Sequence, residues 1–433
     1  MDASKWRPAK LDELGFVGRG KSRYRPRNAA FLYGGRYPFF QTGDIKAANF
    51  YLTEYSQTYS DEGLAQSKLW KPGTLCITIA ANIAESAILA IEGCFPDSVV
   101  GFIANPDKAD VRFIKYYLEI LKLRMQNVSH GATQDNLSLD KLLSFDFIVP
   151  PLPIQQQIAG ILSAYDELIE NCQRRIKILE AMARALYREW FVHFRFPGYE
   201  SVPCVPSSLG EIPQGWEVKK LGELISIHIG GGWGKDVPDE DHNKPAWVIR
   251  GTDIPEVRYS QVGGVPYRIH TTSNLSSRRL HAGDIVFEVS GGSKGQPVGR
   301  TLLISPELLT SLGGDVICAS FCKRIQPDIN RYGSELLYLS FLEGYESGEI
   351  EQYQVQSTGI SNFKWTEYLA NTNRVVPPST LQSEFHGHVA PLFTQIATLG
   401  LKIYNLRHTR DLLLPRLLSG QIPLTTKESI DYA

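Results

Sequence analysis

Two long segments of the chain carry apolar residues at alternating steps of three and four, the spacing of one face of a long helix. After Pro153 the apolar positions are Ile154, Ile158, Ile161, Tyr165, Leu168, Cys172, Ile176, Leu179, Met182, Leu186 and Trp190. After Pro378 they are Leu381, Phe385, Val389, Leu392, Ile396, Leu399, Ile403 and Leu406. This spacing, sustained over several heptads, is typical of a coiled-coil seam. The sequence predicts two long helices, each with a proline in or just before its first turn and the second ending near Pro415.

Each predicted helix is roughly 50–60 Å long, which is well beyond an ordinary globular helix. We therefore expect the two helices to pair with each other in antiparallel orientation. The alternative is that each helix packs on the globular domain that precedes it. The residues expected at the helix pair or at a partner interface are Ile158, Ile161, Tyr165, Leu179, Leu186, Trp190, Phe385, Val389, Leu392, Ile396, Leu399, Ile403 and Leu406.

The rest of the chain contains the same landmarks twice, in the same order. Trp6, Leu11, Glu13 and Leu14 have the spacing of Trp216, Leu221, Glu223 and Leu224. Four more segments follow as pairs: Gln41–Ile45 with Arg250–Ile254, Leu69–Thr74 with Leu280–Asp284, His130–Gln134 with Thr358–Asn362, and Val149–Pro151 with Val376–Pro378. We interpret the chain as an internal repeat.

Each copy of the repeat mixes strands and helices. Leu75–Ile79 and Asp284–Val289 are rich in β-branched and aromatic residues and predict strands. Val111–Met125 and Gly333–Tyr345 are predicted as helices. The expected fold is α+β: two tandem α/β-mixed domains joined by two long antiparallel coiled-coil helices, with a pseudo-two-fold axis.

This interpretation divides the chain into four segments. They are a first domain at residues 1–150, a helix and linker at 151–205, a second domain at 206–378, and a helix and tail at 379–433.

Composition and charge favour a globular protein with local basic surfaces. The 433 residues are 43% hydrophobic and 21% charged, with a net charge of −1. Uniform coating with positive charge is therefore excluded, although local basic faces are not. The six cysteines are scattered, so we expect reduced thiols in a cytoplasmic protein without a metal site. No membrane segment is expected, because the most apolar stretch is too short to cross a bilayer.

One motif suggests an enzyme. Gly15–Ser22 satisfies the G-x-x-x-x-G-K-S pattern of a phosphate-binding loop. That loop needs a buried strand before it and a helix after it, and Pro26 opposes such a helix. Nucleotide binding is therefore kept only as an alternative. We predict no catalytic residue and no cofactor or metal site in this chain.

Basic residues interleaved with aromatic ones predict DNA contact instead. No acidic residue occurs from Leu14 to Gly43, from Val257 to Gly283 or from Val289 to Pro306. Lys and Arg neutralise phosphates, Arg also reads guanine edges, and Asn and Gln suit adenine edges. The candidate DNA-binding residues are Arg19, Lys21, Arg23, Arg25, Arg27, Arg36, Gln41, Thr42, Asn49, Ser129, Gln134, Asn136, Lys235, Arg250, Thr252, Arg258, Arg268, Arg278, Arg279, Lys294, Gln296, Arg300, Gln356, Thr358 and Asn362.

Several segments together resemble a known family, the specificity subunits of type I restriction–modification systems. Pro150–Ala159 is similar to the segment that opens the family's first long helix, and Leu414–Gly420 to its closing segment. Gly18–Ser22 with Arg25–Asn28, and Pro38–Ile45, resemble one class of its target-recognition domains. Gly230–Lys235 resembles another class. The resemblance covers essentially the whole chain. The start of the second helix departs from it, because Val376–Gln382 lacks the Pro-Leu-Pro form.

The resemblance implies a non-catalytic subunit in which each domain reads half of a bipartite target in double-stranded DNA. The helices would set the gap between the halves and dock two methyltransferase subunits, and two restriction and translocation subunits are expected as well. S-adenosylmethionine, ATP and Mg²⁺ would be bound by those partners. A coiled-coil scaffold that does not read DNA is the other alternative.

Overall fold

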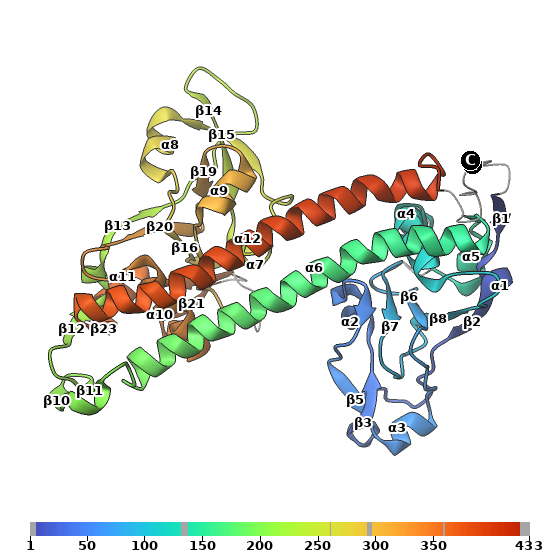
Figure 1. The fold of residues 1–433 in the computed structure, drawn as a ribbon, viewed down its shortest axis with the longest axis horizontal. Helices are drawn as coiled ribbons and strands as arrows, with labels where there is room; N and C mark the ends of the chain where they lie inside the picture. Colours follow the sequence, from blue (N-terminus) through green and yellow to red (C-terminus); the bar gives the residue numbers. More distant parts are fainter. Residues whose placement is uncertain (1–5, 131–136, 260, 292–296, 358–359, 425–433) are drawn as a thin grey trace, which may run out of the picture. The chain divides into compact units, whose positions relative to one another are not determined.

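The computed structural model describes residues 6–130, 137–259, 261–291, 297–357 and 360–424 (Figure 1). The chain forms two compact units, of which the first comprises residues 1–170 and 406–433 and the second residues 171–405. Both units mix strands and helices, so the predicted α+β class is confirmed. Each unit takes one part of each long helix, so the units divide the chain differently from the four predicted segments.

The first unit is built around a five-stranded sheet with the strand order β2-β8-β6-β7-β4. Two smaller sheets pair β3 with β5 and β1 with β9. The strands are β1 (Arg7–Ala9), β2 (Gly15–Arg19), β3 (Tyr33–Phe39), β4 (Tyr51–Leu52), β5 (Gln57–Tyr59), β6 (Leu75–Thr78), β7 (Ser86–Leu89), β8 (Val99–Ala104) and β9 (Phe147–Val149). The helices are α1 (Leu11–Leu14), the 3-10 helix η2 (Ala30–Leu32), α2 (Thr42–Ala47), α3 (Asp61–Ala65), α4 (Val111–His130) and α5 (Leu139–Ser144).

Strands β6 and β7 are buried along their whole length because both faces of the sheet are covered. One core contains Phe102 with Phe113 of α4 and with Leu162 of the first long helix. A second core contains Trp70 and Phe95. Continuous apolar strands such as Leu75–Thr78 are therefore expected here, without the alternation of a half-exposed sheet.

The second unit contains a four-stranded sheet in the order β13-β20-β16-β18, and two three-stranded sheets ordered β15-β14-β19 and β17-β22-β21. Strands β10 (Cys204–Ser207) and β11 (Gly210–Pro213) pair, as do β12 (Glu217–Lys220) and β23 (Asn373–Val376). The other strands are β13 (Ile225–Gly230), β14 (His242–Ile249), β15 (Tyr267–Thr271), β16 (Ile285–Glu288), β17 (Ser290–Gly291), β18 (Thr301–Leu303), β19 (Val316–Cys318), β20 (Cys322–Pro327), β21 (Gln354–Ser357) and β22 (Ile360–Phe363). The helices are η4 (Tyr199–Ser201), η5 (Leu221–Leu224), η6 (Gly251–Asp253), α7 (Ile254–Val257), α8 (Thr272–Arg278), α9 (Pro306–Leu312), α10 (Ser334–Glu346), η7 (Ile350–Tyr353) and α11 (Trp365–Asn371).

The two sheets repeat the same topology, which confirms the internal repeat. The order β2-β8-β6-β7 corresponds to β13-β20-β16-β18, with antiparallel neighbours in both. The landmark turns match in detail as well. The Lys10 amide donates to the Glu13 carboxylate over 3.0 Å, and the Lys220 amide donates to Glu223 over 3.1 Å.

A glycine at the end of the first sheet strand is another shared feature. The Gly20 amide donates to the carbonyl of Val99, and the Gly231 amide to that of Cys322, both over 2.9 Å. A Cβ atom on Gly20 would lie 2.3 Å from the Phe95 carbonyl oxygen, and one on Gly231 would lie 2.1 Å from that of Cys318. Both positions therefore require glycine for steric reasons.

The start of each long helix is fixed by the same glutamine contacts. Gln155 donates through Nε2 to the carbonyls of Pro150 (2.9 Å) and Lys108 (3.1 Å), and its Oε1 accepts from the Asp110 amide. Gln382 donates to the carbonyls of Pro377 and Arg331, both over 2.9 Å. The departure of Val376–Gln382 from the Pro-Leu-Pro form therefore leaves this contact intact.

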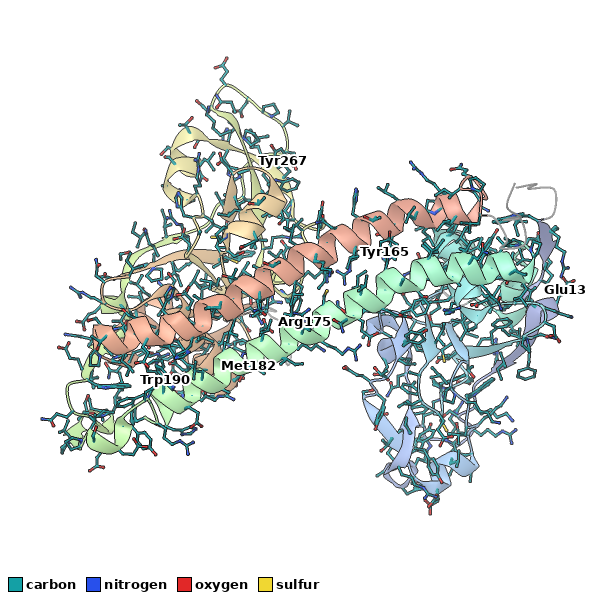
Figure 2. The ribbon with its side chains drawn as sticks, in the orientation of Figure 1. Glu13, Tyr165, Arg175, Met182, Trp190 and Tyr267 are labelled. Carbon is teal, nitrogen blue, oxygen red and sulfur yellow. The ribbon has the colours of Figure 1, made fainter. Side chains whose placement is uncertain are left out.

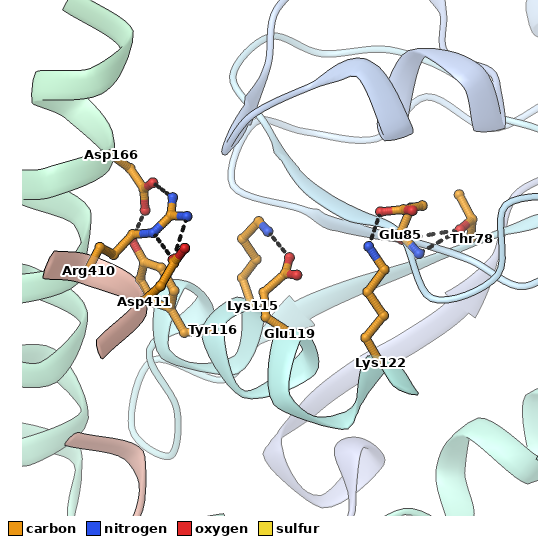
Figure 3. Close-up of polar contacts among 9 residues, drawn as sticks. All are labelled: Thr78, Glu85, Lys115, Tyr116, Glu119, Lys122, Asp166, Arg410 and Asp411. Carbon is orange, nitrogen blue, oxygen red and sulfur yellow. Dashed lines mark hydrogen bonds and ion pairs between the residues drawn. The ribbon is translucent and has the colours of Figure 1, made fainter. Parts of the chain in front are cut away.

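The two long helices are α6 (Leu152–Tyr187) and α12 (Ser379–Leu418). In the first unit, Asp166 of α6 accepts hydrogen bonds from Arg410 of α12 and, over 2.5 Å, from the Tyr116 hydroxyl (Figure 3). Burial, together with Asp166, raises the pKa of the Tyr116 hydroxyl, so it stays protonated. Asp411 also contacts Arg410, over 2.8 Å, so a polar cluster joins the two helices to α4.

In the second unit the contact between α6 and α12 is aromatic. Trp190 lies in a π-helical turn (Arg188–Val192) that continues α6, and its ring centroid is 5.6 Å from that of Phe385. Glu180 lines a shared surface with Phe393 and Ile396. Because lower numbers in α6 meet higher numbers in α12, the two helices run antiparallel within this unit.

The seam predicted on α12 is largely buried, whereas part of the α6 seam requires correction. Ile161 is 36% exposed and the neighbouring Leu162 is buried, so the buried face lies one residue further on. Met182 is likewise 52% exposed beside buried Ala183 (Figure 2). Adjacent apolar residues such as Ile161 and Leu162 fit the same periodicity, so spacing alone could not select the buried one.

The predicted stop at Pro415 is also wrong, since α12 continues to Leu418. Leu417 and Leu418 are buried in the first core, and this burial offsets the one main-chain hydrogen bond that Pro415 cannot donate. No helix in the described ranges is long and apolar enough to cross a membrane. All six cysteines are free thiols.

We expect Gln155→Ala to lower the free energy of unfolding by about 1–3 kcal/mol, because it leaves buried main-chain groups without partners. Gln155 is only 1% exposed, so water cannot replace the lost amide. Chemical denaturation of the full chain measures the change.

The matched control is Gln156→Ala, which removes an exposed amide from the next position of the same helix. Its effect should stay within about 0.5 kcal/mol. Equal effects of the two substitutions would contradict the role given to Gln155.

Candidate nucleic-acid interface

The first predicted basic segment follows strand β2 and is fastened to the segment after α3. The Lys21 carbonyl accepts a hydrogen bond from the Ser67 hydroxyl over 2.8 Å. The Gln66 side-chain oxygen accepts from the amides of Arg23 (2.5 Å) and Tyr24 (3.0 Å). An irregular loop rich in arginine is thereby held in one conformation.

Three of the predicted arginines in the first unit have internal partners. Arg25 donates to the carbonyls of Ser22 and Tyr24, over 2.7 and 2.9 Å. Arg27 makes a two-pronged contact with Asp97, over 2.9 and 3.0 Å. Arg36 donates to the Tyr37 hydroxyl and lies 3.7 Å from Asp61. These side chains are exposed, but part of their hydrogen-bonding capacity stabilises the loops.

The exposed side chains of Arg19, Lys21 and Arg23 differ, since none of them has a carboxylate partner among the described residues. They are the predicted cations best placed to meet an external anion. Of the predicted polar residues, Gln41 donates to Gln57 over 2.7 Å, Thr42 begins α2 and Asn49 is exposed. Ser129 belongs to α4, with its side chain outside the description, and Gln134 and Asn136 fall outside the described residues.

All the described cations predicted in the second unit have partners within that unit. Lys235 forms an ion pair with Asp239, and Arg279 forms one with Asp315. Arg250 forms an ion pair with Asp253. The remaining contacts are Arg268 with Asp236 and with the Trp233 ring, and Arg278 with the Gly230 carbonyl. Segments without acidic residues in the sequence therefore still have carboxylates beside them in the structure, because other elements supply acidic side chains.

Arg258 and Arg300 of the predicted DNA-binding set have acidic partners inside the unit, and their contact with DNA stays a prediction. Arg258 has a side chain only 20% exposed, lies 3.9 Å from Glu180 and donates to the Thr301 carbonyl over 3.0 Å. Arg300 is 14% exposed and holds the buried Glu288 with two hydrogen bonds of 2.8 and 2.5 Å. Those hydrogen bonds to Glu288 raise the pKa of Arg300. Both arginines stabilise the interior of the unit.

The remaining predicted residues of the second unit lie at its surface. Thr252 is exposed on η6, and Gln356 is exposed on β21. Asn362 is exposed on β22 and accepts a hydrogen bond from the Ser290 hydroxyl over 2.8 Å. Because β17, β22 and β21 share a sheet, these amide groups belong to one polar sheet. Lys294, Gln296 and Thr358 fall outside the described residues.

The geometry does not favour the nucleotide-binding alternative. Gly15–Arg19 forms strand β2, and the next helical element begins only at Ala30. The helix N-terminus that would face a phosphate in a G-x-x-x-x-G-K-S loop is thus missing directly after Ser22. Within the described ranges, no group of three or more His, Cys, Asp or Glu side chains is placed to hold a metal ion.

Lys68 is a basic residue that the sequence reasoning missed. Its ammonium lies over the ring of Trp70, 3.6 Å from the centroid, beside the predicted basic loop. The repeat could have revealed it, because aligning Trp70 with Leu280 places Lys68 opposite Arg278. An isolated lysine outside an acid-free stretch gives no other signal.

Comparisons with known proteins agree on one family. Residues 3–181 match the model described as type I restriction modification DNA specificity domain. The chain is 25% identical over 431 residues to the type I restriction enzyme MjaIX specificity subunit of Methanocaldococcus jannaschii, with 96% of this chain and 93% of that protein covered. It is 22% identical over 480 residues to the HindI specificity subunit of Haemophilus influenzae, covering 94% and 98%.

Among solved structures, the S subunit of a type I restriction-modification system from M. genitalium is similar in fold. The TM-score is 0.57 at 15% sequence identity, and 97% of each chain is covered.

We expect Arg300→Met to lower the free energy of unfolding by about 3–5 kcal/mol, because it leaves the Glu288 carboxylate buried without a cation. Adding Glu288→Gln should restore part of the loss, since no unpaired buried charge remains. Chemical denaturation of each variant measures the effect.

Arg19→Met is the control, as it removes an exposed arginine and should change stability by less than about 0.5 kcal/mol. If Arg300→Met kept full stability and lost only DNA affinity, the structural role of Arg300 would be refuted.

Proposed function

We propose that the chain is a specificity subunit of a type I restriction–modification system, in which each unit reads one half of a bipartite DNA target. The observation that carries this proposal is a shared frame with different surface residues. Counted from the equivalent Gly20 and Gly231, the preceding position holds Arg19 in the first unit and Gly230 in the second. Because base choice depends on the side chains and loops presented to the grooves, two such surfaces suit two different half-sites.

The long helices would set the distance between the half-sites. At 1.5 Å per residue, helices of 36 and 40 residues are about 54 and 60 Å long. This exceeds one turn of duplex DNA, which is about 34 Å. A helix pair of that length suits two half-sites separated by a non-contacted gap.

The same helices would dock two methyltransferase subunits. Apolar side chains of α6 remain exposed in each unit: Leu168 (46%) in the first, and Ile178 (59%) and Met182 (52%) in the second. Exposed apolar residues on one helix favour a protein partner. Adenine methylation with S-adenosylmethionine, and ATP- and Mg²⁺-dependent translocation and cleavage, would then be activities of the partner subunits, with this chain as the non-catalytic member.

The experiment that tests the proposal is co-purification of the chain with its native partners, followed by mapping of methylated adenines in host DNA. We expect methylation at a single bipartite sequence, lost when the gene for this chain is deleted. Unchanged methylation after deletion would refute the proposal.

Replacing residues 1–150 with the corresponding segment of another family member should change only one half of the methylated sequence. The reason is that both strands of the β1–β9 pair are replaced together, while the core residues supplied by the long helices, such as Leu162, are kept. A change in both halves, seen in the same methylation map, would contradict independent reading by the two units.

Inserting one heptad into both α6 and α12 should lengthen the gap between the methylated halves. Seven residues add about 10 Å of helix, equal to about three base pairs. Scrambled heptads of equal helix propensity serve as controls for the inserted sequence. An unchanged gap would disprove the spacing role of the helices.

A further inference from the structure

Lys68 is held in place by two aromatic rings of the first unit. Its ammonium lies 3.6 Å from the centroid of the Trp70 ring and 4.8 Å from that of Phe16. The two rings are 6.3 Å apart, and Phe16 is 54% exposed. Cation–π attraction to both rings restricts a side chain that would otherwise sample many rotamers. The cation is therefore pre-positioned at the surface.

Lys21 is brought to the same place by hydrogen bonds of the main chain. Its carbonyl accepts from the hydroxyl of Ser67, the residue directly before Lys68. Its amide donates to the Phe95 carbonyl over 3.0 Å. Burial lowers the pKa of the Lys68 ammonium, and the positive charge of Lys21 lowers it further. Lys21 and Lys68 therefore belong to neighbouring main-chain segments that are joined by a hydrogen bond.

This pair of cations lacks a compensating carboxylate. Other basic residues nearby are paired, as Arg27 is with Asp97, but no described acidic side chain pairs with Lys21 or Lys68. Holding two like charges together is unfavourable unless an anion binds between them. A bound anion such as a phosphate group would supply the missing negative charge.

The second unit does not repeat this arrangement. The amide of Gly232 donates to the Cys318 carbonyl over 2.9 Å, just as that of Lys21 donates to Phe95, so glycine replaces lysine at this position. Arg278, the counterpart of Lys68, donates through Nε to the Gly230 carbonyl over 2.9 Å. The shared frame therefore accepts a cation that has a hydrogen-bond partner, such as Arg278, and a cation that has none in the described part of the chain, such as Lys68. Among the described residues, the two neighbouring cations without a carboxylate partner belong to the first unit.

We propose that Lys21 and Lys68 together bind one phosphodiester group of the DNA backbone, with Phe16 and Trp70 holding Lys68 in position. The site anchors the first unit on its half of the target and carries no sequence information of its own. This inference rests on the proposed function, because it takes DNA as the ligand of the unit.

The test uses the full chain in complex with its native partner subunits and measures DNA affinity at several salt concentrations. Lys21→Gln and Lys68→Gln should each make the plot of log affinity against log salt concentration less steep. One phosphate contact contributes about 0.9 to the magnitude of this slope. Affinity for target and unrelated duplexes should fall by the same factor. Because both cations meet one phosphate, the second substitution should cost less in the presence of the first.

Lys141→Gln is the matched control. Lys141 lies on α5, which Figure 1 places beside the start of α6, whereas α3, just before Lys68, lies at the other end of the same unit. We expect no change in slope. Thermal unfolding of each variant verifies the fold, and Lys21→Gln decides the result if Lys68→Gln unfolds.

Three outcomes would overturn the phosphate site. The first is an unchanged salt slope in both lysine variants. The second is a loss of DNA affinity that is confined to the target sequence. The third is a loss of DNA affinity equal to that caused by Lys141→Gln. In each case a wild-type complex that still prefers its target leaves the proposed function intact. A wild-type complex without target preference would instead refute the proposed function.

Titration with inorganic phosphate and with ATP separates DNA from small anions as the source of the phosphate. We expect neither to bind at micromolar concentration. Tight ATP binding that Lys21→Gln abolishes would overturn the assignment in favour of a nucleotide site.

Discussion

The antiparallel strand pair that closes each copy of the repeat is the constraint on which the rest of the structure depends. Strand β1 meets β9 and β12 meets β23, so the chain returns to its starting point directly before a long helix begins. Gln155 and Gln382 then tie each helix start to the loop that precedes α4 or α10. The start of each long helix is thereby fixed to the domain that precedes it.

Within that closure the two units use charge differently. The described cations predicted in the second unit are neutralised by carboxylates, ring faces or carbonyls, whereas the first unit keeps Arg19, Lys21 and Arg23 without a carboxylate partner among the described residues. Salt dependence of DNA binding should therefore arise mainly in the first unit, and hydrogen bonding should dominate in the second.

Sequence periodicity and repetition were sufficient for the architecture, since they depend on spacing alone. The strands at Leu75 and Ile285 and the helices at Val111 and Ser334 lie where they were predicted. The sequence could not predict which acidic side chains lie beside each arginine in the folded structure. Glu288 neutralises Arg300 from a position twelve residues earlier, and Asp97 neutralises Arg27 from seventy residues away. The buried ion pair of Asp166 with Arg410 was likewise missed, because an apolar pattern cannot reveal it.

Glycine at position 20, beside lysine at position 21, has a consequence for how such a protein changes over generations. A side chain at Gly20 or Gly231 would collide with carbonyl oxygens, whereas the next position accepts lysine in one unit and glycine in the other. Position 20 therefore accepts only glycine, whereas the side chain at position 21 can change without disturbing the sheet. With Lys21 as a phosphate contact, the strength of DNA binding can change by mutation immediately beside a residue whose replacement would disrupt the sheet.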